Sequence, residues 1–202
     1  MQKNETSRKI TLLNIPQPGT EDHVTQKIGR LINTSISSIS ILNEIRNLVF
    51  QIPISELENM THKLAEKLLD IIIQTSSVSS SIEIEFFRKE TLSLLVTLNF
   101  KFQITTSPEK LTKFFKLISN GTIDEMAESL TIIRHSCEIA GNLQTNNFFK
   151  QIASLSIDAG IKRMKSLLNN MNIINYSSFY PYFTLLTLIS FCSRNLNNDQ
   201  LT

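Results

Sequence analysis

A histidine and a cysteine lie two residues apart in the segment TIIRHSCEIAG, residues 131–141. Both side chains can bind a metal ion, and the pair can also act as a nucleophile with its general base. The surrounding pattern, however, predicts a helix over 123–140, in which residues two apart point about 160° away from each other. His135 and Cys137 then can neither hold one ion nor share a proton. We expect Cys137 to pack in the core and His135 to lie exposed on the other side of the helix.

The remaining residues that could carry out acid–base chemistry are scattered along the chain. His62 falls outside the apolar stripe of its predicted helix, so we expect its side chain to be solvated. Glu83 and Glu85 would diverge on a helix, although they would share one face of a strand. Asp124 and Glu125 stand where acidic residues stabilise the N-terminus of a helix. The carboxylates would therefore support an enzyme only if the fold gathers them into a site that the sequence does not reveal.

Glycine placement excludes the common nucleotide-binding loops. The five glycines are dispersed, whereas a dinucleotide fingerprint or a phosphate loop needs clustered glycines so that the backbone can approach the phosphates. The sequence also lacks the H-E-x-x-H, C-x-x-C and G-x-S-x-G patterns of metalloproteases, redox proteins and hydrolases. We therefore expect no cofactor, no metal and no catalytic function.

Composition favours one folded domain. The chain has 202 residues, of which 41% are hydrophobic, enough for a substantial core. Its net charge of +2 is too small to predict nucleic-acid binding from bulk electrostatics. The N-terminal segment MQKNETSRK lacks the apolar region of a signal peptide, so we expect an intracellular protein, cytoplasmic or nuclear. The apolar run 179–193 is shorter than the ~20 residues of a membrane span and predicts a buried helix instead.

Helical periodicity and helix-start signals recur along most of the chain. Ser107 precedes Pro108 in the order typical of an N-cap and the first helical position. Thr122 and Glu125 have the spacing of a capping box, and the short link before them predicts a helical hairpin. The expected helices cover about 21–33, 38–51, 55–75, 82–100, 108–120, 123–140, 144–168 and 178–194. In the 144–168 stretch one apolar face is followed by the opposite one, and this change near Gly160 indicates a kink or contact with two partners. The first face consists of Phe148, Ile152, Leu155 and Ala159, and the second of Ile157, Ile161, Met164 and Leu168.

One segment is ambiguous between helix and strand. Apolar residues alternate with polar ones over 96–105, which is a strand period, while the apolar residues of 84–98 also share one helical face. A helix over about 82–100 is favoured because its neighbours are helical and a lone strand is unstable. A small strand element near 96–105 is the alternative.

These elements predict an all-α fold, a single domain of about seven or eight helices. Short connections favour either an antiparallel bundle or an irregular array similar to a helical repeat protein. We expect a flexible N-terminal tail over 1–9, the helical domain over 10–195 and a frayed C-terminal tail over 196–202.

Apolar residues are more numerous than one face per helix requires. In the 123–140 helix Ile132 and Ile139 form a second stripe, and the last helix is apolar nearly all round, with Tyr180, Tyr182 and Phe183. Such helices must be covered on several sides, either by the core or by a partner. We expect a non-catalytic adaptor or scaffold that binds a partner protein, or itself, through apolar helix faces, with these five residues as candidate partner-facing positions.

Basic residues offer a second hypothesis, nucleic-acid association. Two predicted helices carry clusters that could contact phosphates if the fold gathers them, although ordinary solvated faces explain them as well. The candidate basic patch consists of Lys110, Lys113, Lys116, Lys162, Arg163 and Lys165. An enzyme with a cryptic carboxylate site is the third hypothesis.

Overall fold

The computed structural model of the chain describes residues 21–33, 36–51, 58–76, 81–141, 146–170 and 179–196, and all regular structure within them is helical. The α-helices are α1 (Glu21–Asn33), α2 (Ile39–Gln51), α3 (Glu58–Ser76), α4 (Ile82–Phe102), α5 (Pro108–Leu111), α6 (Phe115–Asn120), α7 (Ile123–Ile139), α8 (Asn147–Asn170) and α9 (Phe179–Leu196). The 3₁₀ helix η1 (Thr112–Phe114) joins α5 to α6, so the described residues form eight helical stretches. This confirms the predicted all-α domain.

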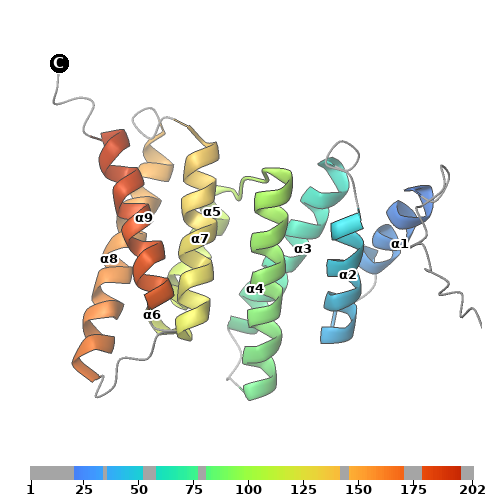
Figure 1. Cartoon of the computed structure of the whole chain (residues 1–202), viewed down its shortest axis with the longest axis horizontal. Helices are drawn as coiled ribbons and strands as arrows, with labels where there is room; N and C mark the ends of the chain where they lie inside the picture. Colours follow the sequence, from blue (N-terminus) through green and yellow to red (C-terminus); the bar gives the residue numbers. More distant parts are fainter. Residues whose placement is uncertain are drawn as a thin grey trace, which may run out of the picture.

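The helices are arranged as a row of pairs in two layers (Figure 1). Within the pairs, α1 packs on α2, α3 on α4, α6 on α7 and α8 on α9. Between the pairs, α2, α4, α7 and α9 follow one another in the front layer, and α6 and α8 pack together behind them. This is a linear stack in which each pair mainly contacts its neighbours, so of the two expected architectures the structure has the helical-repeat-like array.

Sequence-local signals account for several helix ends. Thr122 and Glu125 form the predicted capping box at the start of α7. Ser81 caps α4 by accepting a hydrogen bond from the backbone N–H of Ile84 at 3.3 Å. Pro108 takes the first position of α5 as predicted, but the Ser107 side chain makes no capping hydrogen bond.

The strand alternative near 96–105 is wrong, because α4 continues to Phe102 and ends at Gln103 in the left-handed conformation, with φ 53°. Helix α4 packs against α2, α3 and α7, so apolar residues are needed on several of its sides. In the sequence these residues alternate with polar ones and look like the pattern of a strand. Helix α8 is continuous through Gly160 and contacts α6, α7 and α9, so the change of face near this residue is explained by packing against more than one partner. A Cβ atom at Gly160 would lie 2.8 Å from Cδ1 of Leu185, so the glycine permits close contact between α8 and α9.

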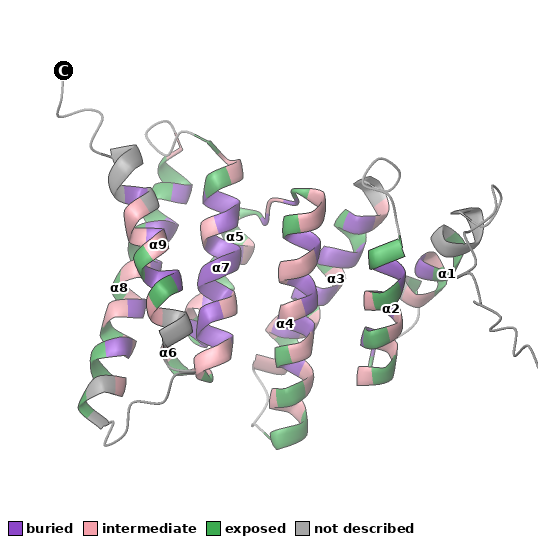
Figure 2. Cartoon of the chain, viewed as in Figure 1, coloured by how far each residue is buried: buried purple, intermediate pink, exposed green. Residues whose placement is uncertain are grey.

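The core runs along the inner sides of both layers (Figure 2). Helix α7 is its central element and packs against α4, α6, α8 and α9. Leu130, Ile132 and Ile133 are all fully buried, although they do not share one face of the helix. A helix covered on so many sides needs apolar residues nearly all round.

Several predictions fall outside the described residues. They concern the tail over 1–9, residues 10–20 of the predicted domain, the start of the helix expected over 55–75, and the end of the chain after 196. Among the helices that the structure describes, none has the length and apolar character that a membrane span requires.

Candidate functional site

The H-x-C pair is separated as predicted, but one of its members lies elsewhere than expected. Cys137 is fully buried, and its thiol donates to the carbonyl oxygen of Phe149 at 3.9 Å. The predicted exposure of His135 is wrong, because this residue is only 3% exposed. Its Nε2 donates to the carbonyl oxygen of Asn99 at 2.8 Å, and its ring stacks on Phe100 with centroids 4.2 Å apart. The end of α4 covers the face of α7 that we expected to meet solvent.

Around His135 lies a buried polar cluster that joins α4, the connection after it, and α7. The amide of Asn99 donates to Oγ1 of Thr106 at 3.5 Å, and the backbone N–H of Thr106 donates to Oγ of Ser136 at 3.3 Å. Oδ1 of Asn99 accepts no hydrogen bond from the described residues. Burial lowers the pKa of His135, which favours a neutral imidazole. These contacts tie two helix pairs together and place no nucleophile beside the imidazole.

Metal binding finds no support in the described part of the chain, where no group of three or more His, Cys, Asp or Glu side chains could hold an ion. Burial raises the pKa of the Cys137 thiol to about 12, and that of Cys192 to about 11. Both cysteines are thus held as neutral thiols, the form that binds metals and attacks electrophiles poorly.

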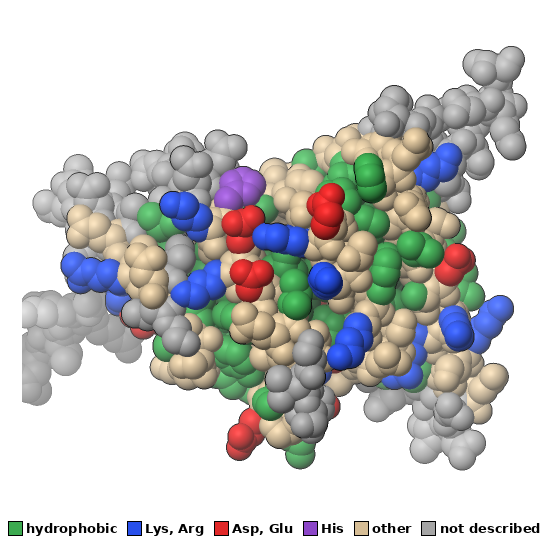
Figure 3. Space-filling view, turned by 180° about the vertical axis from the view of Figure 1, so that it is seen from behind, with side chains coloured by type: hydrophobic (Ala, Val, Ile, Leu, Met, Phe, Trp, Pro, Cys, Tyr) green, Lys and Arg blue, Asp and Glu red, His purple; other side chains and the backbone are tan. Residues whose placement is uncertain are grey.

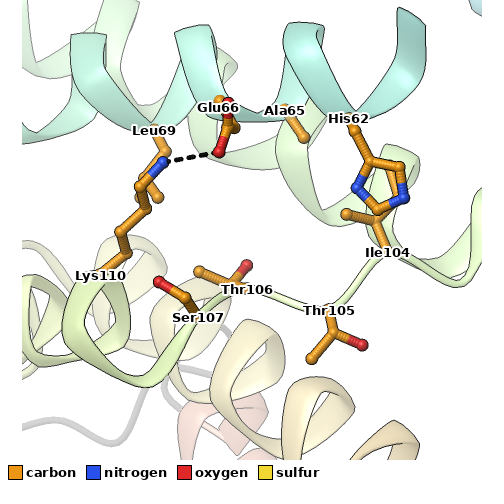
Figure 4. Close-up of a pocket in the computed structure, with 9 residues that line it drawn as sticks. All are labelled: His62, Ala65, Glu66, Leu69, Ile104, Thr105, Thr106, Ser107 and Lys110. Carbon is orange, nitrogen blue, oxygen red and sulfur yellow. Dashed lines mark hydrogen bonds and ion pairs between the residues drawn. The ribbon is translucent and has the colours of Figure 1, made fainter. Parts of the chain in front are cut away.

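A polar cavity of about 100 Å³ lies between α3 and the start of α5 (Figure 4). An ion pair between Glu66 and Lys110, 3.0 Å long, stands at one end, and His62 stands at the other. Ser107 lies at the Lys110 end and Thr106 nearer the middle, and within the described residues neither is hydrogen-bonded to His62. The prediction that His62 is solvated is confirmed, and the cavity lacks an oriented nucleophile and base.

The most deeply buried ion pair among the described residues is one that sequence reasoning missed. Nε of Arg88 lies 2.5 Å from Oε1 of Glu125, with both side chains nearly fully buried between α4 and α7. Arg88 also donates to the carbonyl oxygen of Thr75 at 3.0 Å, and Glu125 accepts from the backbone N–H of Thr122 at 2.8 Å. Both members of the pair are thus hydrogen-bonded to further groups, as a structural clamp requires. The only sequence signal was the capping role of Glu125.

Beside this clamp, two carboxylates on α7 come closest to the predicted cryptic carboxylate site. Lys89 and Asp124 form a half-exposed ion pair of 2.5 Å, and Glu128 lies one turn further along the helix. Burial, followed by the nearby charge of Asp124, raises the pKa of Glu128. Neither carboxylate lines the polar cavity or the apolar groove described next.

An apolar groove lies on the seam between α5 and α8. It has a volume of about 230 Å³. Phe148 is 68% exposed and Leu155 is 45% exposed, while Ile152 between them is buried. Phe148 and Leu155 are seven residues apart, so they share one face of α8. The sequence shows that Phe148, Ile152 and Leu155 share a helical face, but it leaves open whether the core or a partner covers that face. The lining residues are Pro108, Glu109, Thr112, Phe148, Gln151, Ile152 and Leu155.

The five candidate partner-facing residues do not form one surface. Ile132 is fully buried, so it faces the core of its own chain and its prediction as partner-facing is wrong. Ile139 and Tyr182 are half-buried, and the side chain of Tyr180 lies outside the described residues. Phe183 is 66% exposed on α9, where Leu186 is 63% exposed and three residues further along.

The six candidate basic residues lie in one layer, on α5, η1, α6 and α8, but they are not equally free. Lys110 pairs with Glu66, Lys116 donates to the carbonyl oxygen of Ser76 at 2.6 Å, and Arg163 donates to that of Gly121 at 3.3 Å. The exposed members Lys113, Lys162 and Lys165 take part in none of the ion pairs found among the described residues.

Charge is divided between the two layers, which the net charge of the chain conceals. The layer of α3, α5–α6 and α8 faces the viewer in Figure 3, where blue side chains outnumber red ones. Among described side chains it has nine basic residues, Lys63, Lys67, Lys110, Lys113, Lys116, Lys150, Lys162, Arg163 and Lys165, and four acidic residues, Glu66, Asp70, Glu109 and Asp158. The layer of α2, α4, α7 and α9 has five basic residues, Arg46, Arg88, Lys89, Lys101 and Arg134, and eight acidic residues, Glu44, Glu83, Glu85, Glu90, Asp124, Glu125, Glu128 and Glu138.

The apolar groove therefore lies in the basic layer, with Lys113 next to one wall in sequence and Lys162 two helical turns beyond Leu155 of the other wall. Comparison of the chain with protein-family models, with curated proteins and with solved structures finds no match.

Proposed function

We propose that this protein is a non-catalytic helical interaction module, an adaptor or scaffold that binds a partner protein or a second copy of itself. The observation that carries the proposal is the apolar groove between α5 and α8, flanked by the exposed side chains of Phe148 and Leu155. The exposed pair Phe183 and Leu186 on α9 provides a second apolar surface. An intracellular location, cytoplasmic or nuclear, is part of the same proposal.

Large apolar side chains at the surface support this function because each leaves area in contact with water that binding would remove. Aromatic side chains in particular supply much of the binding free energy at protein interfaces. A row of helix pairs also presents long continuous faces, which repeat proteins use for binding. The groove combines both features, whereas Phe183 and Leu186 line neither the groove nor the polar cavity described above.

Quantitative affinity purification from the native source tests the proposal. Three baits are compared: the natural chain, the double variant Phe148→Ser/Leu155→Ser, and Phe50→Ser. Phe50 is the matched control because it is 63% exposed on α2, in the other layer. We expect at least one partner that the double variant loses and the control retains. Light scattering on the purified chain tests the second-copy form. The proposal would be contradicted if the purified chain is a monomer and the double variant retains every partner that the natural chain captures. It would also be contradicted by a monomer that captures no partner.

Nucleic-acid association is the second candidate function, and the excess of basic residues on the α3, α5–α6 and α8 layer favours it. Binding to a duplex or single strand would release counterions, so the affinity would fall steeply with salt. Titration of a fluorescein-labelled oligonucleotide between 50 and 200 mM salt tests this function. Replacement of Lys113 and Lys162 by glutamate should then weaken binding and reduce the salt dependence. No measurable binding at low salt would exclude this candidate.

A further inference from the structure

We propose that the groove binds an acidic peptide segment, in which one bulky apolar side chain enters the groove and flanking aspartate or glutamate residues meet the surrounding lysines. This inference rests on the proposed function and specifies the chemistry of the partner. It commits to a protein segment as the occupant.

The groove has the size and character to accept one apolar side chain. Its volume of about 230 Å³ exceeds the roughly 150 Å³ that accommodates a benzene ring in a protein cavity. Phe148 and Leu155 are about 10 Å apart along the axis of α8 and form the two ends of one wall. Buried Ile152 lies between them, and Pro108 on the opposite wall has no backbone N–H to leave unpaired. An aromatic or branched aliphatic side chain would bury these surfaces.

Two lysines lie near the groove. Lys113 comes directly after Thr112 of one wall. Lys162 is seven residues beyond Leu155 and therefore lies two turns further on the same face of α8. Lys150 is two residues from both Phe148 and Ile152, so it points away from the groove. The side chains of Lys113 and Lys162 are exposed, and no ion pair among the described residues engages them. Their ammonium groups remain available to carboxylates on a partner.

Two carboxylates oppose this arrangement and limit its extent. Glu109 lines the groove and is exposed, and Asp158 lies three residues beyond Leu155. The layer as a whole still has nine basic residues against four acidic ones among its described side chains. Carboxylates on the flanks of a peptide therefore meet an attractive field on average, whereas lysines or arginines there would be repelled.

A peptide is favoured over a nucleic acid because the centre of the surface is apolar. Phosphate contacts need exposed basic groups along the path of the backbone. Here the path passes over Phe148, Leu155 and Pro108, with Glu109 among them. An aromatic ring can stack on a nucleobase, so the test includes an oligonucleotide.

Selection of binders from a phage-displayed library of random 12-residue peptides on the full chain tests the inference. The most enriched peptide is then synthesised with a fluorescent label, and its Kd is measured by anisotropy. We expect an aromatic, leucine or isoleucine residue flanked by aspartate or glutamate. Phe148→Ser should weaken binding at least tenfold and Phe50→Ser less than twofold. Lys113→Glu/Lys162→Glu should weaken binding about fivefold or more. Thermal unfolding of each variant checks that it is folded.

The outcomes separate the inference from the proposed function. Peptides that depend on Phe148 but lack acidic flanks would overturn the inference and leave the proposed function in place. Binding that ignores Phe148→Ser, or the absence of any enriched peptide, would overturn the inference, and the affinity-purification result would then decide the proposed function. A labelled single-stranded oligonucleotide that binds more tightly than the peptide and competes with it would overturn the inference. The ligand of the groove would then be a nucleic acid and not an acidic peptide.

Discussion

At the scale of single residues, the carbonyl oxygen of Asn99 connects two helix pairs. It accepts hydrogen bonds from the backbone N–H groups of Gln103 and Ile104, which end α4, and from Nε2 of His135 on α7. Because Nε2 must carry a proton to donate, the imidazole can stay neutral only if Nδ1 is unprotonated. The end of one helix and the protonation state of a side chain on another are therefore linked.

His135 should make the stability of the protein depend on pH. Burial lowers the pKa of this residue in the folded state below the ordinary value of about 6.5. As the pH falls through 6.5, the unfolded chain takes up a proton that the folded chain does not, so the free energy of unfolding decreases. Urea unfolding at pH 7.5 and pH 5.5 measures the decrease. His135→Gln should show a smaller decrease than the natural chain; an equal decrease would contradict this assignment.

The two cysteines should be unreactive while the protein is folded. Both thiols are buried, and burial raises the pKa of Cys137 to about 12 and that of Cys192 to about 11. Since the thiolate is the reactive form, reaction with Ellman's reagent at pH 8 should be slower by on the order of 100-fold or more than in denaturant. Guanidinium chloride should release both thiols. Fast modification of one thiol in the folded chain would show that its burial is wrong.

At the scale of elements, the buried ion pair between Arg88 and Glu125 fixes α4 against α7. Arg88→Met leaves the Glu125 carboxylate buried without its partner, which should lower the free energy of unfolding by about 3–5 kcal/mol. Arg88→Met/Glu125→Gln leaves no buried charge and keeps a residue that can complete the capping box, so part of the loss should be recovered. Urea unfolding of both variants measures these values.

Lys89 supplies the matched control for the buried pair. It forms an ion pair with Asp124 between the same two helices, but both side chains are nearly half exposed. Lys89→Met should therefore cost no more than about 1 kcal/mol. A cost as large as that of Arg88→Met, or a double variant less stable than the single one, would contradict the clamp.

Two helical glycines should respond differently to the same substitution. A Cβ atom at Gly29 in α1 would meet no atom within 4 Å, so Gly29→Ala should stabilise the protein by about 0.5–1 kcal/mol. At Gly160 in α8 the added atom would lie 2.8 Å from Cδ1 of the buried Leu185, which must move. Gly160→Ala should thus be less favourable than Gly29→Ala in thermal unfolding. Equal gains would show that α8 and α9 are not in close contact at this point.

Helix positions could be predicted from the sequence because their signals are local. The capping box at Thr122 and Glu125 and the proline at the start of α5 act within a few residues of the chain. The environment of a helix face could not be predicted, because it depends on which other helices pack there. His135 and Ile132 are buried for this reason, since α7 lies at the centre of the stack. Periodicity placed Phe148 on an apolar face of its helix, but it could not show that the fold leaves this side chain exposed.

At the scale of the whole molecule, the two-layer arrangement separates charges that alternate along the chain. Basic residues predominate on the layer of α3, α5–α6 and α8, and acidic residues on the layer of α2, α4, α7 and α9. The net charge of +2 showed neither excess, because it sums the two layers. The apolar groove could not be predicted either, since its walls come from segments about 40 residues apart in the sequence. Only the stacking of helix pairs places them side by side.

The central claim is that the groove between α5 and α8 is the binding surface. Chemical-shift mapping of the ¹⁵N-labelled chain with the selected acidic peptide tests it most directly. We expect the largest backbone amide shifts in 109–116 and 148–155, and smaller shifts near the exposed Phe183 of α9. Shifts concentrated on α9 or on α2 and α4, with the amides of the groove unchanged, would contradict the account.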